Sequence, residues 1–318
     1  MTEHDQPTRN FTDLPIYSAD DIARVVPYAT AVEAIEEALR GSVDPAQDPA
    51  RTFVEVDQGQ LLLMPSSGGG YAGVKLATVA PDNPARGLPR IQAVYVIFDA
   101  STLAPIALLD GTALTTLRTP AVSAAAARAL TSERIDRLVV FGSGPQGGGH
   151  VEALGAIRDI GSVRIVGRDR AKAAALCEDL VRKGFDASVG AVDDVREADV
   201  IACATTSPTP LFDGQLVRDD ACVLAIGAHT PDQRELDSGL MGRSTVVVED
   251  HAAARREAGD VVLAAADGVL DIDDTLSLRD VVRGDVRIAD GRPTVFKGTG
   301  MSWQDLAVAS AAYRVLAS

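Results

Sequence analysis

LVVFGSGPQGGGH, at residues 138–150, is the stretch that decides the fold of this chain. Residues 138–141 are apolar and predict a buried strand that runs directly into a glycine. Residues 142–147 then spell G-x-G-x-x-G, and residues 151–157 predict a helix. A glycine motif placed between a strand and a helix is typical of a Rossmann unit that binds a dinucleotide.

The glycines of this motif have separate uses. Gly142 lets the strand turn sharply, Gly144 lets the backbone approach a diphosphate, and Gly147 lets the helix pack close to the strand. The diphosphate would sit on the free N–H groups of the helix start, with Pro145 and Gln146 among its contacts. A glycine-rich turn without any ligand is the alternative.

The end of the next predicted strand, residues 163–166, bears on the choice of dinucleotide. In a Rossmann unit an acid at this point bonds the ribose of NAD, whereas a nearby arginine accommodates the 2′-phosphate of NADP. Here Gly167 occupies the acid's position and Arg168 follows it, while Asp169 comes late and can cap the next helix. The sequence therefore predicts NADP(H) in preference to NAD(H), unless these cations are ordinary surface charges.

The pattern of predicted secondary structure changes at a long alanine-rich helix expected at residues 112–130. Within this helix, Pro120 predicts a helix start or a kink. Before it, short helices are followed by a meander of strands, which is typical of an α+β unit. After it, strands alternate with helices as in a mainly parallel sheet, before a final helix at residues 303–316. The strands are expected at residues 52–56, 61–64, 71–79, 92–98, 104–109, 138–141, 163–166, 200–203, 223–226 and 246–248.

The composition argues against several classes of protein. The 318 residues carry a net charge of −15, which disfavours binding to nucleic acid or to an anionic membrane surface. No apolar run is long enough to cross a membrane. The three cysteines and four histidines lack the spacing of a disulfide framework or a metal site. Because the polar N-terminus has no apolar leader, we expect a cytoplasmic protein.

Further strings recur in order along nearly the whole chain. Together with the glycine loop they resemble the ornithine cyclodeaminase/mu-crystallin family of dehydrogenase-like proteins. The resemblance implies an α/β homodimer with a smaller α+β substrate-binding and dimerisation domain at residues 1–120, completed by a C-terminal helix at 301–318, and a Rossmann domain at 121–300. The strings that carry it are LMP at 63–65, GVK at 73–75, PDN at 81–83, GLP at 87–89, LDG at 109–111, LRTPAVS at 117–123, AIGA at 225–228, EL at 235–236, EAGD at 257–260, VFKGTG at 295–300 and DLA at 305–307.

The resemblance also implies which side chains bind the substrate. It assigns the substrate's carboxylate to Arg51 and Lys75, and it adds Met64 to the same site. A guanidinium can hold a carboxylate through two parallel bonds. Lys75 lies within an apolar strand, so it either points outward or is buried in a pocket, where a lowered pKa would suit it to proton transfer.

The cofactor contacts implied by the resemblance are more widely spread. Arg118 and Thr119 correspond to a pair that meets the cofactor phosphates, with the substrate carboxylate as the alternative partner of Arg118. Thr205 and Thr206 correspond to residues that line the nicotinamide ribose, although such residues are also common in plain turns. Arg90 adds a cation near the phosphates.

Two positions depart from the ornithine-cyclising branch of the family. Leu62 stands where that branch has an acid for the distal amine, so a second ammonium group would find no counter-charge. His229 stands where that branch has the aspartate credited with base chemistry. A histidine can be an acid–base group at this position or a loop residue beside the cofactor. The mu-crystallin branch also lacks the aspartate, and the strings at 92–98 and 231–236 are most similar to it.

The resulting hypothesis is an NADPH-dependent reductase of a cyclic imino acid, either Δ1-pyrroline-2-carboxylate or Δ1-piperideine-2-carboxylate. Its product is proline or pipecolate. Arg51 and Lys75 hold the carboxylate, and Lys75 or His229 provides the proton. The alternatives are an alanine-dehydrogenase-like enzyme, an ornithine or lysine cyclodeaminase of altered specificity, and a mu-crystallin-like protein that binds a small ligand.

Overall fold

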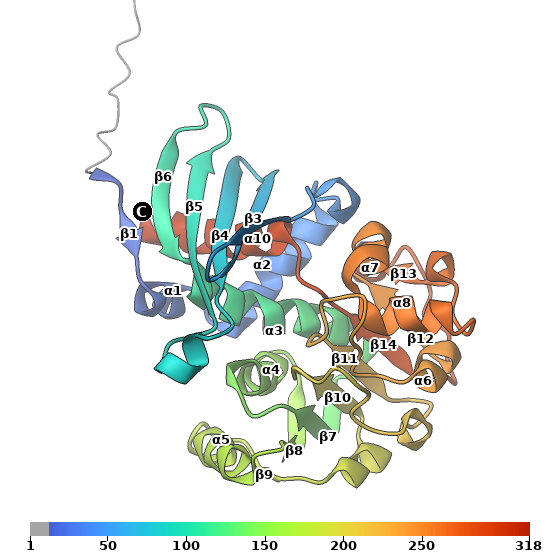
Figure 1. The fold of residues 1–318 in the computed structure, drawn as a ribbon. Helices are drawn as coiled ribbons and strands as arrows, with labels where there is room; N and C mark the ends of the chain where they lie inside the picture. The colour runs from blue at the N-terminus through green and yellow to red at the C-terminus, as the bar shows by residue number, and fades with distance from the viewer. Residues whose placement is uncertain (1–12) are drawn as a thin grey trace, which may run out of the picture.

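The computed structural model describes residues 13–318, so the polar N-terminal segment and His4 lie outside the described residues. Two β-sheets make up the fold, and the long helix α3 (Gly111–Leu130) runs between them (Figure 1). One sheet is mixed and the other is entirely parallel. The predicted α/β class, with a Rossmann unit beside an α+β unit, is therefore confirmed.

The first sheet has six strands in the order β1-β6-β5-β4-β3-β2. All neighbouring strands are antiparallel except β1 and β6. Strands β2 to β6 follow one another along the chain and in space, which confirms the expected meander. Their bounds are β1 (Ile16–Tyr17), β2 (Thr52–Val56), β3 (Gly59–Gly68), β4 (Tyr71–Val79), β5 (Ile91–Asp99) and β6 (Pro105–Asp110).

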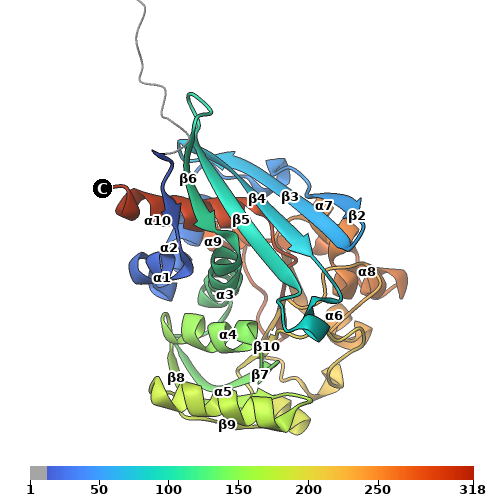
Figure 2. The same cartoon turned by 60° about the vertical axis from the view of Figure 1, so that its left-hand side comes forward.

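Helices cover one face of this sheet. The last helix of the chain, α10 (Ser302–Leu316), contacts β3 and β4 and also packs against α2 (Tyr28–Arg40) and α3. The short α1 (Ala19–Val25) begins with a capping box between Ser18 and Asp21. In Figure 2 no helix of residues 13–318 lies over the opposite face, where Leu76 and Val94 are 38% and 37% exposed.

The second sheet has eight parallel strands in the order β13-β12-β14-β11-β10-β7-β8-β9. The strand order reverses between β7 (Arg134–Phe141) and β10 (Val200–Cys203). Ligands of open α/β sheets bind outside the carboxyl ends of the strands at such a switch point, and the glycine loop follows β7 there. The remaining strands are β8 (Asp159–Val166), β9 (Ala187–Val189), β11 (Cys222–Ala225), β12 (Thr245–Val248), β13 (Leu276–Ser277) and β14 (Thr294–Lys297).

Two helices differ from their sequence-based predictions. The helix expected from residue 151 is α4 (Pro145–Gly155), which begins inside the glycine loop. Proline suits a first helical position, because its φ is already helical and its missing N–H is not needed there. Helix α3 runs through Pro120 without the expected start, since packing against α2, α4 and α10 holds it. The predicted domain boundary at residue 120 therefore falls within a helix.

The other α-helices belong to the second half of the chain. They are α5 (Arg170–Arg182), α6 (Ser238–Arg243), α7 (His251–Glu257), α8 (Gly259–Ala266) and α9 (Leu278–Arg283). Short 3-10 turns lie in both halves, at Pro45–Gln47, Asn83–Arg86, Val192–Glu197, Gly214–Leu216 and Ile272–Asp274.

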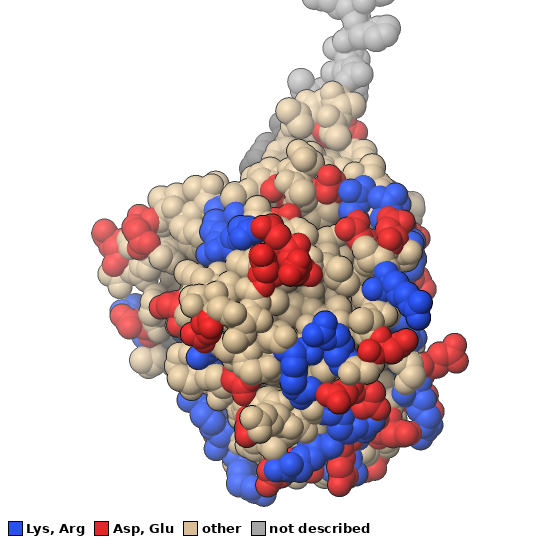
Figure 3. Space-filling view, turned by 90° about the vertical axis from the view of Figure 1, so that its right-hand side faces the viewer, with Lys and Arg blue, Asp and Glu red and all other residues tan. Residues whose placement is uncertain are grey.

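Within residues 13–318, no helix is both long and apolar enough to span a bilayer. On the face drawn in Figure 3, basic and acidic side chains are interspersed.

Candidate active site

Lys75 lies in a row of side chains that faces α10. The register of the first sheet places Met64 on β3 and Tyr95 on β5 directly beside it. Lys75 is 2% exposed, so the alternative of an outward-pointing surface charge is wrong. Its ammonium donates to both carboxylate oxygens of Asp305, at 2.9 and 2.8 Å, and to Thr115 Oγ1 at 3.1 Å. A buried ion pair therefore joins the sheet to the C-terminal helix.

The surroundings of Lys75 change its acidity. Burial lowers the pKa of Lys75 to about 8, although Asp305 opposes the shift. The nearby cations Arg118 and Arg51 lower the pKa further. An ammonium with this pKa is charged at neutral pH and releases its proton more readily than an ordinary lysine does. Lys75 is thus suited to proton transfer as well as to binding an anion.

Arg118 joins the same cluster from α3. Its side chain is buried, its Nη1 donates to Gln304 Oε1 at 3.0 Å, and its Nε lies 3.5 Å from Asp305 Oδ1. A Cβ placed on Gly300 would lie 2.6 Å from the guanidinium, so Arg118 also touches the loop after β14. The structure brings Arg118 together with Lys75, as its alternative role at a substrate carboxylate requires.

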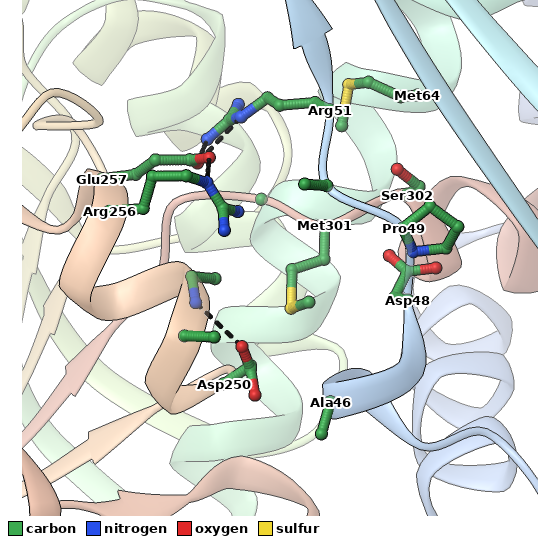
Figure 4. A pocket seen from close by; sticks show the side chains of 14 residues that line it. Ala46, Asp48, Pro49, Arg51, Met64, Asp250, Arg256, Glu257, Met301 and Ser302 are labelled. Atoms are coloured by element: carbon green, nitrogen blue, oxygen red, sulfur yellow. Dashed lines mark hydrogen bonds and ion pairs between the residues drawn. The ribbon is translucent and has the colours of Figure 1, made fainter.

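Arg51 reaches from the start of β2 to the second half of the chain. Its guanidinium pairs with Glu257 on α7 through Nε and Nη2, and Nη2 also donates to the carbonyl oxygen of Thr299 at 3.2 Å. Nη1 makes no hydrogen bond to the described residues and is left for an anion. Figure 4 shows the pair at one end of a pocket of about 60 Å³, which Met64 also lines. Arg51 is thus oriented by Glu257 while one nitrogen stays available.

Buried acids hold the loops at the switch point of the second sheet. Glu235 accepts hydrogen bonds from the backbone and hydroxyl of Thr205, after β10, and from the backbone N–H of Gly227, after β11. Asp260 accepts from the backbone of Glu235 and forms an ion pair with Lys297 at the end of β14. The hydroxyl of Thr205, a predicted ribose contact, is therefore already used to fix its loop.

His229 is exposed on the loop after β11. Its Nδ1 lies 3.0 Å from the carbonyl oxygen of Gly227, and because a carbonyl only accepts, Nδ1 carries the proton of the neutral ring. Desolvation by the surrounding protein lowers the pKa of His229, although the hydrogen bond to Gly227 opposes this shift. The cations Arg51, Lys297 and Arg90 lower the pKa further. At neutral pH the ring therefore offers an acceptor, Nε2, and is not an acid.

The glycine loop fits a dinucleotide diphosphate. Gly142 has a φ of 118°, and a Cβ on Gly147 would lie only 2.1 Å from its carbonyl oxygen, so strand and helix pack as closely as the motif predicts. A Cβ on Gly144 would meet nothing within 4 Å, which leaves this residue open to a ligand. No described side chain caps the start of α4, so its N–H groups can bind an anion.

His150 supports the loop from within the fold. Its Nδ1 donates to the carbonyl oxygen of Gln146 at 2.7 Å, and its Nε2 accepts from Ser123 Oγ at 2.9 Å. Burial lowers the pKa of His150 to about 4, although the bond to Gln146 opposes this. Pro145 and Gln146 lie in the first turn of α4, and Gln146 Oε1 is buried without a hydrogen-bond partner among residues 13–318.

The turn after β8 carries a free cation at the predicted ribose position. Asp169 caps α5 by accepting from two backbone N–H groups, as predicted. Arg168 is exposed and makes no hydrogen bond or ion pair to any described residue. Gly167 lies against the glycine loop, where a Cβ would be 3.2 Å from Ser143 Oγ. This turn and the glycine loop therefore lie side by side.

Three other residues predicted to contact the cofactor make no side-chain hydrogen bond to the described loops of the site. Thr119 donates its hydroxyl to the carbonyl oxygen of Thr115 within α3. Thr206 is exposed and makes no hydrogen bond to the described part of the chain. Arg90 is exposed near the end of the loop before β5, and its charge acts on His229.

Sequence reasoning misses the partners that complete the substrate side of the site. Asp305, Glu257 and Gln304 received no role, although the first two lie in strings that carry the family resemblance. Lys75 itself was the signal for these partners, because a lysine inside an apolar strand needs a buried counter-charge. Asp305, an acid in the largely apolar final helix, was the candidate for that counter-charge.

Comparison with known proteins agrees with this architecture. Residues 15–318 match the model of the ornithine cyclodeaminase/mu-crystallin family. The chain is 32% identical over 305 residues to the alanine dehydrogenase of Archaeoglobus fulgidus, covering 94% of each chain. It is 34% identical over 317 residues to the Δ1-pyrroline-2-carboxylate/Δ1-piperideine-2-carboxylate reductase of Azospirillum brasilense, covering 96% of this chain and 97% of that one.

A solved structure agrees as well. The Δ1-pyrroline-2-carboxylate reductase of Thermococcus litoralis, in complex with NADH and L-proline, superposes with a TM-score of 0.88. It is 27% identical in sequence, and the match covers 95% of this chain and 97% of that chain.

Proposed function

The chain belongs to the ornithine cyclodeaminase/mu-crystallin family and is an NAD(P)-dependent oxidoreductase acting on carbon–nitrogen bonds; from that premise we propose that it reduces a cyclic imino acid. The proposed substrate is Δ1-pyrroline-2-carboxylate or Δ1-piperideine-2-carboxylate, and the product is proline or pipecolate. The observation that carries the proposal is Lys75, a buried cation with a pKa of about 8 that lies beside Arg118. The named activities of the Azospirillum and Thermococcus relatives support the same substrate class.

The proposed binding mode places the substrate carboxylate within reach of Arg51, Lys75 and Arg118. Arg51 contributes the nitrogen that Glu257 leaves free. Leu62 lies two residues before Met64 on the same inward face of β3, so the adjoining wall is apolar. An apolar wall suits a compact ring and offers no counter-charge to a second ammonium group, which disfavours diamino acids.

Lys75 is the proposed proton donor to the imine nitrogen. Its ammonium is charged below pH 8, whereas His229 is neutral at pH 7 and offers only the Nε2 lone pair. We assign to His229 the role of accepting a hydrogen bond from the substrate or from a water molecule. A bound reduced nicotinamide supplies the hydride that the imine carbon accepts.

The preference for NADP(H) is part of the proposal. Residues 142–147 and the free N–H groups of α4 would hold the diphosphate. Arg168 is free to pair with a 2′-phosphate, while Oδ1 of Asp169 caps α5. Arg170 and Lys172 add positive charge at the same turn.

The test is turnover of each cyclic imine with NADPH and with NADH, followed through the loss of reduced-nicotinamide absorbance. We expect turnover whose rate falls as pH rises above about 8, because Lys75 then loses its proton. Lys75→Arg, which keeps the charge but holds its proton, should retain the KM within a few-fold and lower kcat by about a hundredfold or more. Failure of both imines with both nicotinamides would exclude the proposed reaction.

A second candidate function is alanine dehydrogenase activity, which the relative from Archaeoglobus fulgidus favours. The same residues could hold the carboxylate of pyruvate, and an imine formed from pyruvate and ammonia is an open-chain analogue of the cyclic substrates. Ammonia-dependent oxidation of NADH or NADPH with pyruvate, at a kcat/KM above that for the imines, would favour this function. Tight binding of an aromatic ligand without any turnover would instead indicate a binding protein.

We further propose that the first sheet pairs two subunits. Its open face carries an apolar row formed by Leu63, Leu76 and Val94, which are cross-strand neighbours. An uncovered apolar sheet face is typical of a protein interface. Under this proposal residues 1–120 and 301–318 bind substrate and dimerise, while residues 121–300 bind the dinucleotide. Light scattering should show a homodimer that Leu76→Glu converts to a monomer.

A further inference from the structure

Tyr95 is a buried phenol beside Lys75 that the proposed reaction does not use. It is fully buried, and its hydroxyl has no hydrogen-bond partner among residues 13–318. Burial raises the pKa of Tyr95, and the charges of Asp305 and Asp48 raise it further, so both carboxylates lie near the phenol. Gly73 makes the space for it, since a Cβ there would lie 2.1 Å from the hydroxyl oxygen. A buried polar atom without a partner and near two acids is typical of a site for an ordered water.

Asp48 connects this buried group to an open pocket through Ser66, the cross-strand neighbour of Gly73. It lines the open pocket of Figure 4 together with Ser302, whereas Lys75 does not line this pocket. Its Oδ1 accepts from Ser66 Oγ at 2.7 Å, and its Oδ2 accepts from the backbone N–H of Trp303 at 3.1 Å. Burial raises the pKa of Asp48 to about 6 against these bonds, so the group can both gain and lose a proton near neutrality.

Lys75 needs a source of protons if it is the donor of the proposed reaction. Its ammonium is 2% exposed and bonded to Asp305, whose side chain is completely buried. Bulk water therefore does not reach this ion pair directly. The pocket at Asp48 holds about 60 Å³, enough for a few water molecules. Asp48 accepts from the backbone N–H of Trp303, two residues before Asp305, and from Ser66, whose cross-strand neighbour Gly73 lies against the Tyr95 hydroxyl.

We propose that Asp48, Tyr95 and Asp305, linked by a buried water at the Tyr95 hydroxyl, carry protons from the solvent pocket to Lys75. The path deepens the proposed function and rests on it. In each turnover the imine carbon gains a hydride from the reduced nicotinamide, and the imine nitrogen gains a proton from Lys75 Nζ. The neutral amine of Lys75 then takes a proton through Asp305, the Tyr95 hydroxyl and Asp48 from pocket water. The sum is one hydride and one proton added across the C=N bond.

Other charged groups also act on this path. Arg118 lies 3.5 Å from Asp305, and Arg51 is near enough to lower the pKa of Lys75. Both are cations, so they favour the release of a proton from Lys75. They cannot relay protons themselves, because a guanidinium does not lose its proton in the accessible pH range.

Two conservative variants test the path. Tyr95→Phe removes only the hydroxyl, and Asp48→Asn keeps an acceptor for the N–H of Trp303. We expect each to lower kcat about tenfold while KM stays within twofold, and the solvent deuterium isotope effect on kcat to rise. Tyr71→Phe, at the far end of β4, is the matched control and should leave kcat and the isotope effect unchanged. A wild-type kcat in both path variants would overturn the proposal.

A crystal structure of the wild-type protein without substrate gives a readout that does not depend on activity. It should contain an ordered water bonded to the Tyr95 hydroxyl and to Asp48 or Asp305. Absence of this water in well-resolved density would also overturn the path. If the wild-type enzyme turns over no imine, the proposed function fails, whereas normal turnover in Tyr95→Phe and Asp48→Asn rejects only the path.

Discussion

The two ends of the candidate site are assembled in opposite ways. The cofactor end consists of residues 142–147 and the turn at 167–169, so its parts are contiguous segments at neighbouring strand ends. The substrate end consists of Lys75, Arg118 and Arg51 with their partners Asp305, Gln304 and Glu257. These pairs are separated by 230, 186 and 206 residues. One end is thus a local motif, and the other exists only after the chain has returned on itself.

The difference lies in the kind of interaction that each end uses. The cofactor end offers backbone N–H groups and an open glycine, and a short sequence motif can specify these. The substrate end buries charges, and each buried charge is tolerated only beside a partner of opposite sign. A defect at the cofactor end should therefore affect binding or local packing. A defect at the substrate end should affect stability and chemistry together.

The largest expected effect comes from Asp305→Asn. It leaves the ammonium of Lys75 buried without a counter-charge, which typically costs about 3–5 kcal/mol of folding free energy. The pKa of Lys75 should fall further, because the partner that raises it is gone. We expect kcat to fall by about a hundredfold or more. Denaturant unfolding and steady-state kinetics measure the two effects.

The double variant Lys75→Met with Asp305→Leu is the control for this prediction. It removes the charges of Lys75 and Asp305 but leaves buried Arg118 without its acidic neighbour, so it should recover part of the lost stability without recovering activity. A double variant as unstable as Asp305→Asn would mean that packing or the unpaired Arg118, and not the charge of Lys75, dominates this position.

A second prediction compares one buried titratable group beside each end. Asp48 has a pKa of about 6 in the fold against an ordinary 3.8, so the folded state binds the extra proton and stability falls as pH rises from 4 to 6. His150 has a pKa of about 4 against an ordinary 6.5, so its contribution is fully present above pH 6.5 and is lost as pH falls towards 4. Each effect is on the order of 3 kcal/mol.

Unfolding measured from pH 4 to pH 7 separates these opposite slopes. The stability of Asp48→Asn relative to wild type should increase as pH rises, and that of His150→Gln should increase as pH falls. Parallel pH profiles for wild type and both variants would contradict the assignment of the two groups.

The third prediction separates the glycine that packs against the protein from the glycine that would contact the ligand. Gly147→Ala places a methyl group 2.1 Å from the carbonyl oxygen of Gly142, which should cost about 1–3 kcal/mol of stability. Gly144→Ala meets no protein atom within 4 Å, so stability should stay unchanged while the KM for the dinucleotide rises about tenfold or more. Thermal unfolding and cofactor titration distinguish them, and a stability loss in Gly144→Ala would refute the division.

The smallest expected effect concerns the choice of dinucleotide. Arg168→Ala should reduce the proposed preference for NADPH over NADH by about tenfold, because a cation that would pair with the 2′-phosphate is lost. Gly167→Asp should raise the kcat/KM for NADH, since its carboxylate would meet the ribose and Ser143 needs to move only slightly. Arg182→Ala, at the other end of α5, serves as the neutral control. Unchanged cofactor ratios in both turn variants would exclude this turn as the selector.

The regular elements show where local sequence information is sufficient. Strands β2 to β6 of the first sheet and most strands of the second lie close to their predicted residues, because apolar runs bounded by turn formers determine them locally. The short β1, β9 and β13 were missed, since two or three residues carry no periodicity. The four-residue β14 was also missed, and it ends in Lys297, which is buried with an ion pair to Asp260 and a hydrogen bond to the carbonyl oxygen of Ala228.

The sequence alone determined the dinucleotide unit and the family, because glycine spacing and short contiguous strings carry that information. It also supplied Lys75, Arg118 and Arg51 at the substrate end, but not their partners. Only the tertiary structure decided that Lys75 is buried and bonded to Asp305, that Arg118 lies with Lys75, and that Arg51 is oriented by Glu257. The physical reason is that the acidity and orientation of a charged side chain depend on the charges and solvent around it. Those surroundings come from segments about two hundred residues apart, which no local pattern brings together.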